Sequence, residues 1–404
     1  MIVSSFRAGK MLWPICRSIL VLCLSLVEFP PASGFIRIYW NVPTFMCSKY
    51  GIQFNDVEKE YGVIQNVNDT FRGNEISILY DPGNFPALLE NSSSGRLVKR
   101  NGGVPQEGSL TEHLNIFSKH LDELIPNKDY EGLAVIDFES WRPVFRQNFG
   151  TLQPYRNLSI RIEREKHRNW SHREIVKEAA KVFENAGRKF MEQTIKRAKA
   201  ARPKALWGYY AFPYCFNGNS RDPLSCSNEV QQENNRIMWL FDSSDIILPS
   251  VYLTEAWAPN MRKSIIKGRV GEANRVARAT RKRPRPHVLT YIRYAYTDTL
   301  NFLSQADLYD AFSVMDQKKS DGILWGSSFD LNSRCVYIQT DLVLYTGPFI
   351  IAQSFLFSFQ SKCYTHSVKC QRFRKYLEDQ LGPILRLFTK PKYSVQGVIH
   401  QQWH

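Results

Sequence analysis

Two carboxylates lie two residues apart where a short apolar run of the chain ends. Asp137 and Glu139 follow the run Leu-Ala-Val-Ile at 133–136, whose β-branched residues and preceding glycine are typical of a buried strand. Side chains two apart on a strand point the same way. Both acids are therefore expected on one face of a sheet, at the carboxyl end of the strand.

This pair could supply a general acid. Two neighbouring carboxylates cannot both ionise easily, so one of them should keep its proton near neutral pH, as a general acid must. The pair is also compatible with a helix N-terminus, where the backbone dipole favours acidic side chains. The rest of the chain favours the catalytic interpretation.

The elements that must position these acids alternate between strands and helices. Strands are predicted at residues 35–40, 76–80, 133–136, 206–212, 245–253, 287–294 and 322–326. Helices are expected after the capping boxes at Ser109 and Ser171, and at residues 230–241, 261–281 and 303–315. Such alternation predicts parallel pairing. For a chain of 404 residues it indicates a single-domain α/β fold, a TIM-like (β/α) barrel, with an open doubly wound sheet as the alternative.

Aromatic and amide side chains also follow the predicted strands. Besides the two acids, Asn41, Tyr210, Tyr252 and Trp325 lie at predicted carboxyl ends, where barrels place functional groups. Aromatic rings stack on the apolar faces of sugars, and amides bond sugar hydroxyls. Each aromatic residue taken alone is more typical of a core than of a site, but their shared placement predicts a sugar-binding mouth.

The charge of the chain suggests a polyanionic partner. The formal net charge is +15, with a pI near 9.4, and the surplus is spread through the sequence. The most basic stretch, residues 262–285, should end at the bottom of the barrel and is interpreted as a solvated face. Basic residues after the third strand are better placed for a polyanion: Arg142, Arg146, Arg161 and Arg164.

The N-terminal segment predicts export. Arg7 and Lys10 precede an apolar stretch at 19–27, and small residues follow, so residues 1–34 are interpreted as a signal peptide. A membrane anchor is the alternative, but the stretch is too short to span a bilayer. Outside residues 1–34 the number of cysteines is even and no Cys-x-x-Cys spacing occurs, which predicts disulfides and no metal site. Four glycosylation sequons agree with export: Asn68, Asn91, Asn157 and Asn169.

Export changes the expected partners. A secreted, extracellular protein is not expected to bind nucleic acid, and no membrane association is expected, which leaves extracellular polysaccharide as the leading polyanion. No Gly-x-Gly-x-x-Gly follows the first predicted strand, so no nucleotide cofactor is expected either.

Five sequence motifs are distinctive. They are Ile-Asp-Phe-Glu-x-Trp-Arg-Pro (136–143), Tyr-Trp-Asn-Val-Pro-Thr (39–44), Trp-Gly-Tyr-Tyr-x-Phe-Pro-Tyr-Cys (207–215), Pro-Ser-Val-Tyr-Leu (249–253) and Trp-Gly-Ser-Ser (325–328). Together they resemble the hyaluronidases of glycoside hydrolase family 56, most closely the insect venom type. The resemblance implies a distorted barrel of about seven parallel strands. It also implies a monomeric enzyme that hydrolyses β-1,4 linkages of hyaluronan, with chondroitin as a second candidate substrate.

The resemblance further implies roles for single residues. Glu139 would be the proton donor, and Asp137 would orient the substrate's acetamido group, which acts as the nucleophile, and hold Glu139 protonated. Sugar-binding roles would fall to Tyr210, Tyr252, Trp325 and Asn41, and to a further acid, Asp298. The implied disulfides are Cys47–Cys370 and Cys215–Cys226.

One segment departs from the family pattern. Residues 335–368 include an apolar run at 342–359 and are interpreted as an insertion, with retained non-coding sequence as its suggested origin, because so long a loop is unusual in a compact domain. Cys335 and Cys363 would pair with each other or stay free. Two other functions compete with hydrolysis of hyaluronan. One is a catalytically impaired glycosaminoglycan-binding protein on the same fold, and the other is a chitin-cleaving enzyme, which the positive charge disfavours.

Overall fold

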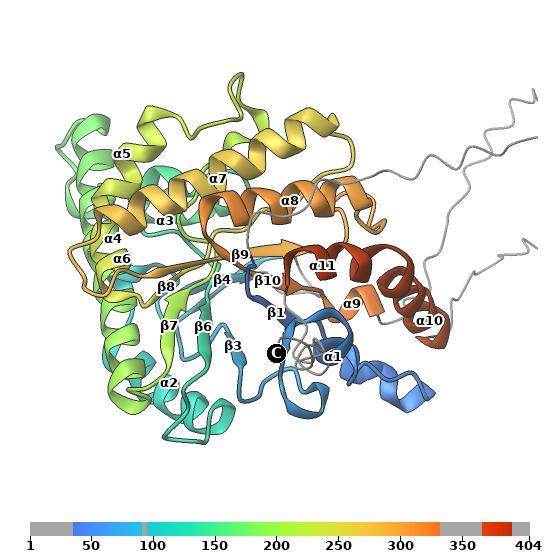
Figure 1. The fold of residues 1–404 in the computed structure, drawn as a ribbon. Coiled ribbons are helices and arrows are strands. Elements are labelled where there is room, and N and C mark those ends of the chain that lie inside the picture. The colour runs from blue at the N-terminus through green and yellow to red at the C-terminus, as the bar shows by residue number, and fades with distance from the viewer. Residues whose placement is uncertain (1–34, 91–94, 332–365, 390–404) are drawn as a thin grey trace, which may run out of the picture. The chain divides into compact units, whose positions relative to one another are not determined.

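The computed structural model describes residues 35–90, 95–331 and 366–389 (Figure 1), all within one compact unit, Ala32–His404. The predicted signal peptide at 1–34, Asn91, Cys335 and Cys363 lie outside the described residues. So does the predicted insertion, except that residues 366–368 begin the helix α10 (His366–Tyr376).

The predicted strands are present as a set of parallel neighbours. They are β1 (Ile38–Asn41), β3 (Ile76–Tyr80), β6 (Leu133–Asp137), β7 (Leu206–Tyr209), β8 (Ile246–Ile247), β9 (His287–Arg293) and β10 (Asp321–Trp325), with the short β2 (Ile64–Gln65) beside β1. The fourth strand ends earlier than predicted, because Ala211 adopts a left-handed φ of 71° that breaks the extended backbone. The fifth is shorter than predicted and continues as isolated bridges at Leu248 and Ser250.

The order of the strands is that of a barrel. Neighbours run β3-β6-β7, then through the bridge Tyr210–Leu248 to β8-β9-β10-β1-β2. The first strand thus pairs with the last, whereas a doubly wound sheet would reverse its strand order in the middle. The barrel prediction is therefore confirmed and the alternative is wrong. Within the described ranges β2 and β3 share no ladder, and this opening distorts the barrel.

The side chain of Asn66 spans that opening. Its Oδ1 accepts hydrogen bonds from the backbone N–H groups of Glu75 (2.9 Å) and Ile76 (3.0 Å), and its Nδ2 donates to the carbonyl oxygens of Thr70 (2.8 Å) and Ile76 (2.9 Å). The residue is 2% exposed. One buried amide thus gives the edge of β3 the partners that a neighbouring strand would supply.

Helices surround the strands (Figure 1). The α-helices are α1 (Val57–Tyr61), α2 (Leu110–Leu124), α3 (Gln153–Lys166), α4 (His172–Ala201), α5 (Asn228–Arg236), α6 (Met238–Ser243), α7 (Pro259–Ala279), α8 (Gln305–Lys318), α9 (Ser328–Leu331), α10 and α11 (Gly382–Phe388); β4 (Ala87–Glu90) and β5 (Leu97–Arg100) form a hairpin. Ser109 caps α2 and a full capping box at Ser171 opens α4, as predicted. No helix in the described ranges is both long and apolar enough to cross a bilayer.

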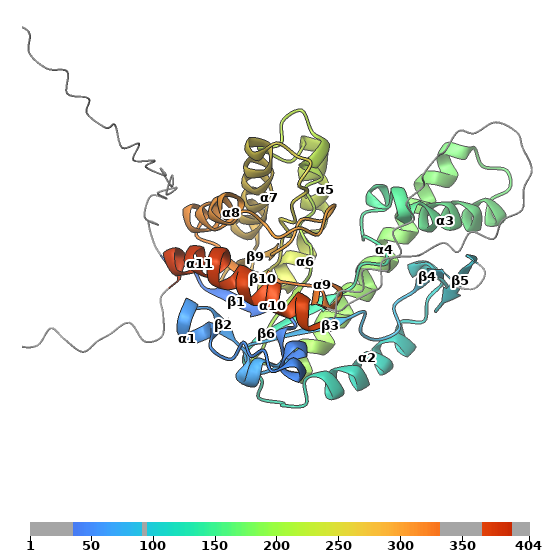
Figure 2. The same ribbon diagram turned by 90° about the vertical axis from the view of Figure 1, so that its right-hand side faces the viewer.

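Much of the basic stretch at 262–285 is not a solvated face. Arg262 is buried and pairs with Asp307 at 2.9 Å, which joins α7 to its neighbour α8 (Figure 2). At the amino end of β8, Asp245 binds both Lys199 and Lys282. The interpretation as a solvated face is therefore wrong for these residues, which hold helices to one another and to the bottom of the barrel.

Two disulfides tie loops to the barrel. Cys47, after β1, is joined to Cys370 in α10 (Cα–Cα 5.7 Å), and Cys215 is joined to Cys226 in the loop after β7 (5.0 Å). Arg374 of α10 also binds Asp56 with two 2.7 Å hydrogen bonds. The first disulfide and this ion pair together fix α10 against the chain that follows β1.

Replacement of Asn66 by alanine should destabilise the fold. The variant would remove the side-chain partner of the N–H groups of Glu75 and Ile76, while the C=O of Ile76 would keep only its bond from the N–H of Gly73, at a cost of about 2–3 kcal/mol. Guanidinium unfolding followed by circular dichroism would measure the loss. The matched control is Asn74→Ala, an exposed amide of the same loop, which should cost less than about 1 kcal/mol. Equal effects of the two changes would contradict this role.

Candidate active site

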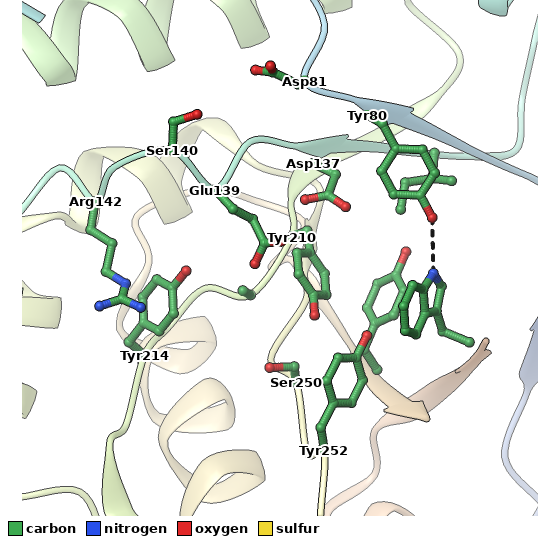
Figure 3. Close-up of a pocket in the computed structure, with 14 residues that line it drawn as sticks. Tyr80, Asp81, Asp137, Glu139, Ser140, Arg142, Tyr210, Tyr214, Ser250 and Tyr252 are labelled. Carbon is green, nitrogen blue, oxygen red and sulfur yellow. Dashed lines mark hydrogen bonds between the residues drawn. The ribbon is translucent and has the colours of Figure 1, made fainter. Parts of the chain in front are cut away.

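A cavity of about 530 Å³ opens at the carboxyl ends of the barrel strands (Figure 3). The wall consists of Ile78, Tyr80, Asp81, Asp137, Glu139, Ser140, Arg142, Tyr210, Ala211, Tyr214, Ser250, Tyr252, Tyr291 and Trp325. Six of the residues predicted from the sequence are therefore brought together, namely the two acids, Arg142, Tyr210, Tyr252 and Trp325. Asn41 and Asp298 are not among the lining residues.

Strand β6 positions the two acids. It is paired on both sides, to β3 and β7, and its residues 133–136 are at most 2% exposed. Phe138 points into the core, where its ring stacks on Phe85 at 4.0 Å between centroids. Asp137 and Glu139 consequently point the other way, into the cavity. Asp137 is the last residue of β6, so the helix N-terminus interpretation is wrong.

Burial shifts the pKa values of both acids upward. Burial, with smaller contributions from the charges of Glu139 and Asp81, raises the pKa of Asp137 to about 8. Burial also raises the pKa of Glu139, and the positive charge of Arg142 partly offsets this. The pair thus keeps a proton into the neutral range. The larger shift lies on Asp137, whereas the sequence interpretation placed the proton on Glu139.

Aromatic side chains form the wall on one side of the acids. The rings of Tyr252 and Trp325 stack at 5.6 Å with an interplanar angle of 17°. The indole Nε1 of Trp325 donates a 3.1 Å hydrogen bond to the hydroxyl of Tyr80. Tyr210 meets Tyr291 edge to face at 4.9 Å. This is a rigid, flat-faced wall of the kind on which a sugar ring can stack.

The other side of the acids carries a cation. Arg142 and Tyr214 lie on the opposite side of Glu139 from Tyr80 and Tyr252 (Figure 3). The guanidinium of Arg142 lies over the ring of Tyr214, 4.4 Å from its centroid, and Nη1 donates to the carbonyl oxygen of Gln147 at 2.7 Å. A positive charge is thereby fixed in the cavity wall.

The other three basic residues predicted for the mouth do not line the cavity. Arg146 is paired with Glu233 and Glu229. Arg161 and Arg164 lie on α3, where Nη2 of Arg164 approaches the ring of His172. Among the four arginines only Arg142 is in the wall.

Asn41 and Asp298 have other surroundings. Asn41 is 1% exposed, and its Nδ2 donates to the carbonyl oxygen of Phe71 at 3.3 Å. Asp298 accepts hydrogen bonds from the backbone N–H groups of Glu255 and Ala256, which lower the pKa of its carboxyl. Asp298 therefore holds together the loops that follow β8 and β9, rather than reaching the cavity.

Sequence reasoning missed eight residues of the wall. Ser140, Ala211, Tyr214 and Ser250 belong to motifs already singled out, and Tyr80 ends a predicted strand that Asp81 follows, so position alone could have found these six. Ile78 lies inside β3 and is buried, as a core residue would be. Tyr291 lies inside β9 and is fully buried, and no pattern in the sequence distinguishes it from core.

Two further predictions concern glycosylation and metal binding. The sequon residues Asn68, Asn157 and Asn169 are all exposed, as attachment of a glycan requires. In the part of the chain that the structure describes, no three His, Cys, Asp or Glu side chains gather as a metal site would require.

The chain is similar in sequence and in structure to known proteins. A family model described as hyaluronidase matches residues 30–383. A hyaluronidase of Tabanus yao is 46% identical over 78% of this chain and 91% of that protein. An inactive hyaluronidase B of Vespula vulgaris is 39% identical over 79% and 94%. The crystal structure of bee venom hyaluronidase in complex with a hyaluronic acid tetramer matches with a TM-score of 0.77, at 44% identity, over 87% of this chain and 99% of that one.

The raised pKa of Asp137 predicts a pH-dependent stability difference. Between about pH 4 and pH 8 the folded carboxyl holds a proton that the unfolded chain has lost, so wild-type stability falls as pH rises. Asp137→Asn removes this effect. As pH rises, the free energy of unfolding of the variant should therefore increase relative to that of wild type by up to about 1.4 kcal/mol per pH unit. Unfolding midpoints across this range would test the difference.

The control for that experiment is Asp298→Asn. Its carboxyl has a lowered pKa, so the stability it contributes is complete above about pH 4 and is lost only at lower pH. Its difference from wild type should be flat between pH 5 and 8. A flat difference for Asp137→Asn as well would contradict the shift assigned to Asp137.

Proposed function

The chain belongs to the hyaluronidase family, glycoside hydrolase family 56, and we propose that this glycoside hydrolase cleaves β-1,4 linkages of hyaluronan within the chain. The observation that carries the proposal is the pair Asp137 and Glu139, which shares a proton in a cavity with aromatic walls. The resemblance to a structure that contains a hyaluronic acid tetramer supports the choice of substrate.

The proposed mechanism is substrate-assisted and retains the anomeric configuration. Glu139 gives its proton to the glycosidic oxygen as the C–O bond breaks, and the acetamido oxygen of the same sugar attacks the anomeric carbon. The resulting oxazoline is opened by a water molecule whose proton returns to Glu139. Asp137 accepts a hydrogen bond from the acetamido N–H throughout.

The placement of the proton before substrate binds fits this scheme. In the empty site the larger pKa increase lies on Asp137. A bound acetamido N–H donates to the charged form of Asp137, which lowers the pKa of Asp137 and moves the shared proton towards Glu139. Substrate binding would thus put the proton on the residue that must donate it.

The two walls of the cavity would bind the sugars on either side of the bond that Glu139 cleaves. Tyr210, Tyr252 and Trp325 would hold the N-acetylhexosamine whose bond is cleaved, with the Tyr252 hydroxyl bonding the acetamido group. On the other side Arg142 would pair with the carboxylate of the uronic acid that leaves. Chondroitin carries the same alternation of uronate and N-acetylhexosamine and is the second candidate substrate.

A binding protein without catalysis is the second candidate function. It is favoured by the 39% identity to a relative that is described as inactive. The raised pKa values of both acids argue for the enzyme, because binding alone has no use for a proton held at this cost. We also propose a secreted monomer, supported by the sequence of residues 1–34, the exposed sequons and the disulfides.

Glu139→Gln tests the proposed function. The amide keeps the shape of the side chain but cannot donate the proton, so hyaluronan cleavage in a reducing-sugar assay should fall by ~10² or more. The matched control is Glu131→Gln, an exposed residue before β6, which should retain full activity. Near-normal turnover by a folded Glu139→Gln protein would exclude Glu139 as the donor, and no turnover by wild type would favour the binding protein.

A further inference from the structure

Two phenylalanine rings pack against Arg142 and Tyr214, next to the wall of the cavity. The guanidinium carbon of Arg142 lies 5.5 Å from the ring centroid of Phe149 and 5.1 Å from that of Phe216. The two rings meet at 5.1 Å, and Phe216 stacks in parallel on Tyr214 at 5.4 Å. Arg142 and Tyr214 line the cavity on the side of Glu139 that faces away from Tyr252 (Figure 3), and the two phenylalanine rings pack directly against them.

Phe149 is an exposed ring on a rigid loop. Its neighbour Asn148 is fully buried, accepts a 2.8 Å hydrogen bond from the N–H of Arg142, and donates to the carbonyl oxygens of Arg142 (2.9 Å) and Val144 (3.1 Å). The loop is thereby closed on itself. The ring of Phe149 is nevertheless 44% exposed, so a fixed backbone presents apolar surface to solvent.

Phe216 is held in an unfavourable backbone conformation. Its φ of 54° is left-handed, a region that residues with a Cβ atom rarely adopt. The disulfide of Cys215 precedes it, and the buried Asn217 follows it, donating to the carbonyl oxygens of Pro223 (2.6 Å) and Ile265 (3.1 Å). Strain that persists under such restraint is typical of functional sites, and here it orients a ring beside the cavity.

We propose that Phe149 and Phe216 form an aromatic subsite for the second sugar on the leaving-group side of the cleaved bond. This rests on the proposed function. In a polymer that alternates uronate and N-acetylhexosamine, the first leaving sugar carries the carboxylate that meets Arg142. The next sugar is an uncharged N-acetylhexosamine, whose apolar ring face and acetamido methyl match an aromatic surface. The protein thus presents a cation followed by aromatic rings, and the substrate presents a charged uronate followed by an uncharged N-acetylhexosamine.

A pair of substitutions at Phe149 separates aromatic stacking from simple burial. Phe149→Tyr keeps the ring and should leave KM for polymeric hyaluronan within about twofold. Phe149→Leu removes the ring and should raise KM about three- to tenfold, the range for one aromatic contact. The control is Phe45→Leu, which has the same 44% exposure in the helical turn Thr44–Tyr50 but does not pack on Arg142 and Phe216 as Phe149 does, and which should match wild type.

Substrate length provides the second measurement. Cleavage that leaves a single sugar on the leaving side cannot use the proposed subsite, so Phe149→Leu should affect that cut no more than Phe45→Leu does. Cuts that leave two or more sugars should show the full three- to tenfold loss. An equal loss at every cut, or no loss at any, would overturn the subsite.

Carboxyl-reduced hyaluronan shows whether Phe149 acts only by holding Arg142. This uncharged polymer has no carboxylate for the guanidinium, but its ring faces are unchanged, so the Phe149→Leu penalty should persist. A penalty confined to the charged polymer would overturn direct stacking. If wild type binds but cleaves neither polymer, the proposed function fails, whereas normal cleavage by wild type and by Phe149→Leu alike rejects only the subsite.

Discussion

The site depends on two neighbouring carboxyl groups that the end of one strand holds in a cavity wall, where Asp137 is half-buried and Glu139 reaches the open side. Removing a carboxylate from water costs several kcal/mol unless it is paired or protonated. Here Asp137 and Glu139 respond by keeping a proton, with the pKa of Asp137 raised to about 8. The ladders to β3 and β7, and the stacking of Phe138 on Phe85, hold the two acids in the wall of the cavity. The reactive proton is thus a consequence of how β6 is packed.

Around this pair of acids the barrel is closed by the pairing of β1 with β10 and is open between β2 and β3. β1 pairs with β10, and the Cys47–Cys370 disulfide and the Arg374–Asp56 pair add two further links between distant parts of the chain. Between β2 and β3 one amide, Asn66, replaces a ladder. The cavity has an aromatic wall on one side of Glu139 and a cationic wall on the other, an arrangement suited to a chain that passes through rather than to a ligand that is enclosed.

Much of this could be predicted from the sequence, because the features concerned are local. Strand periodicity placed both acids on one face of β6, and the rule for strand ends brought Tyr210, Tyr252 and Trp325 together. The same rule did not hold for Asn41, whose amide bonds the carbonyl oxygen of Phe71 instead of lining the cavity. For Asp298, which the family resemblance suggested, the sequence does not reveal that two backbone N–H groups take up the carboxylate. Asn66 and Tyr291 were missed for a related reason: their roles depend on neighbours that are distant in the chain.

Net charge was the least informative property of the sequence. The surplus of +15 suggested a polyanion, yet Arg146, Arg262 and Lys282 are each bound to carboxylates that hold the fold together. Arg142 differs because aromatic rings and a backbone carbonyl surround its guanidinium. Rings and carbonyl groups position a cation without neutralising it, whereas a carboxylate does both. The local partners of each arginine, rather than the total charge, therefore determine which one remains available to an acidic substrate.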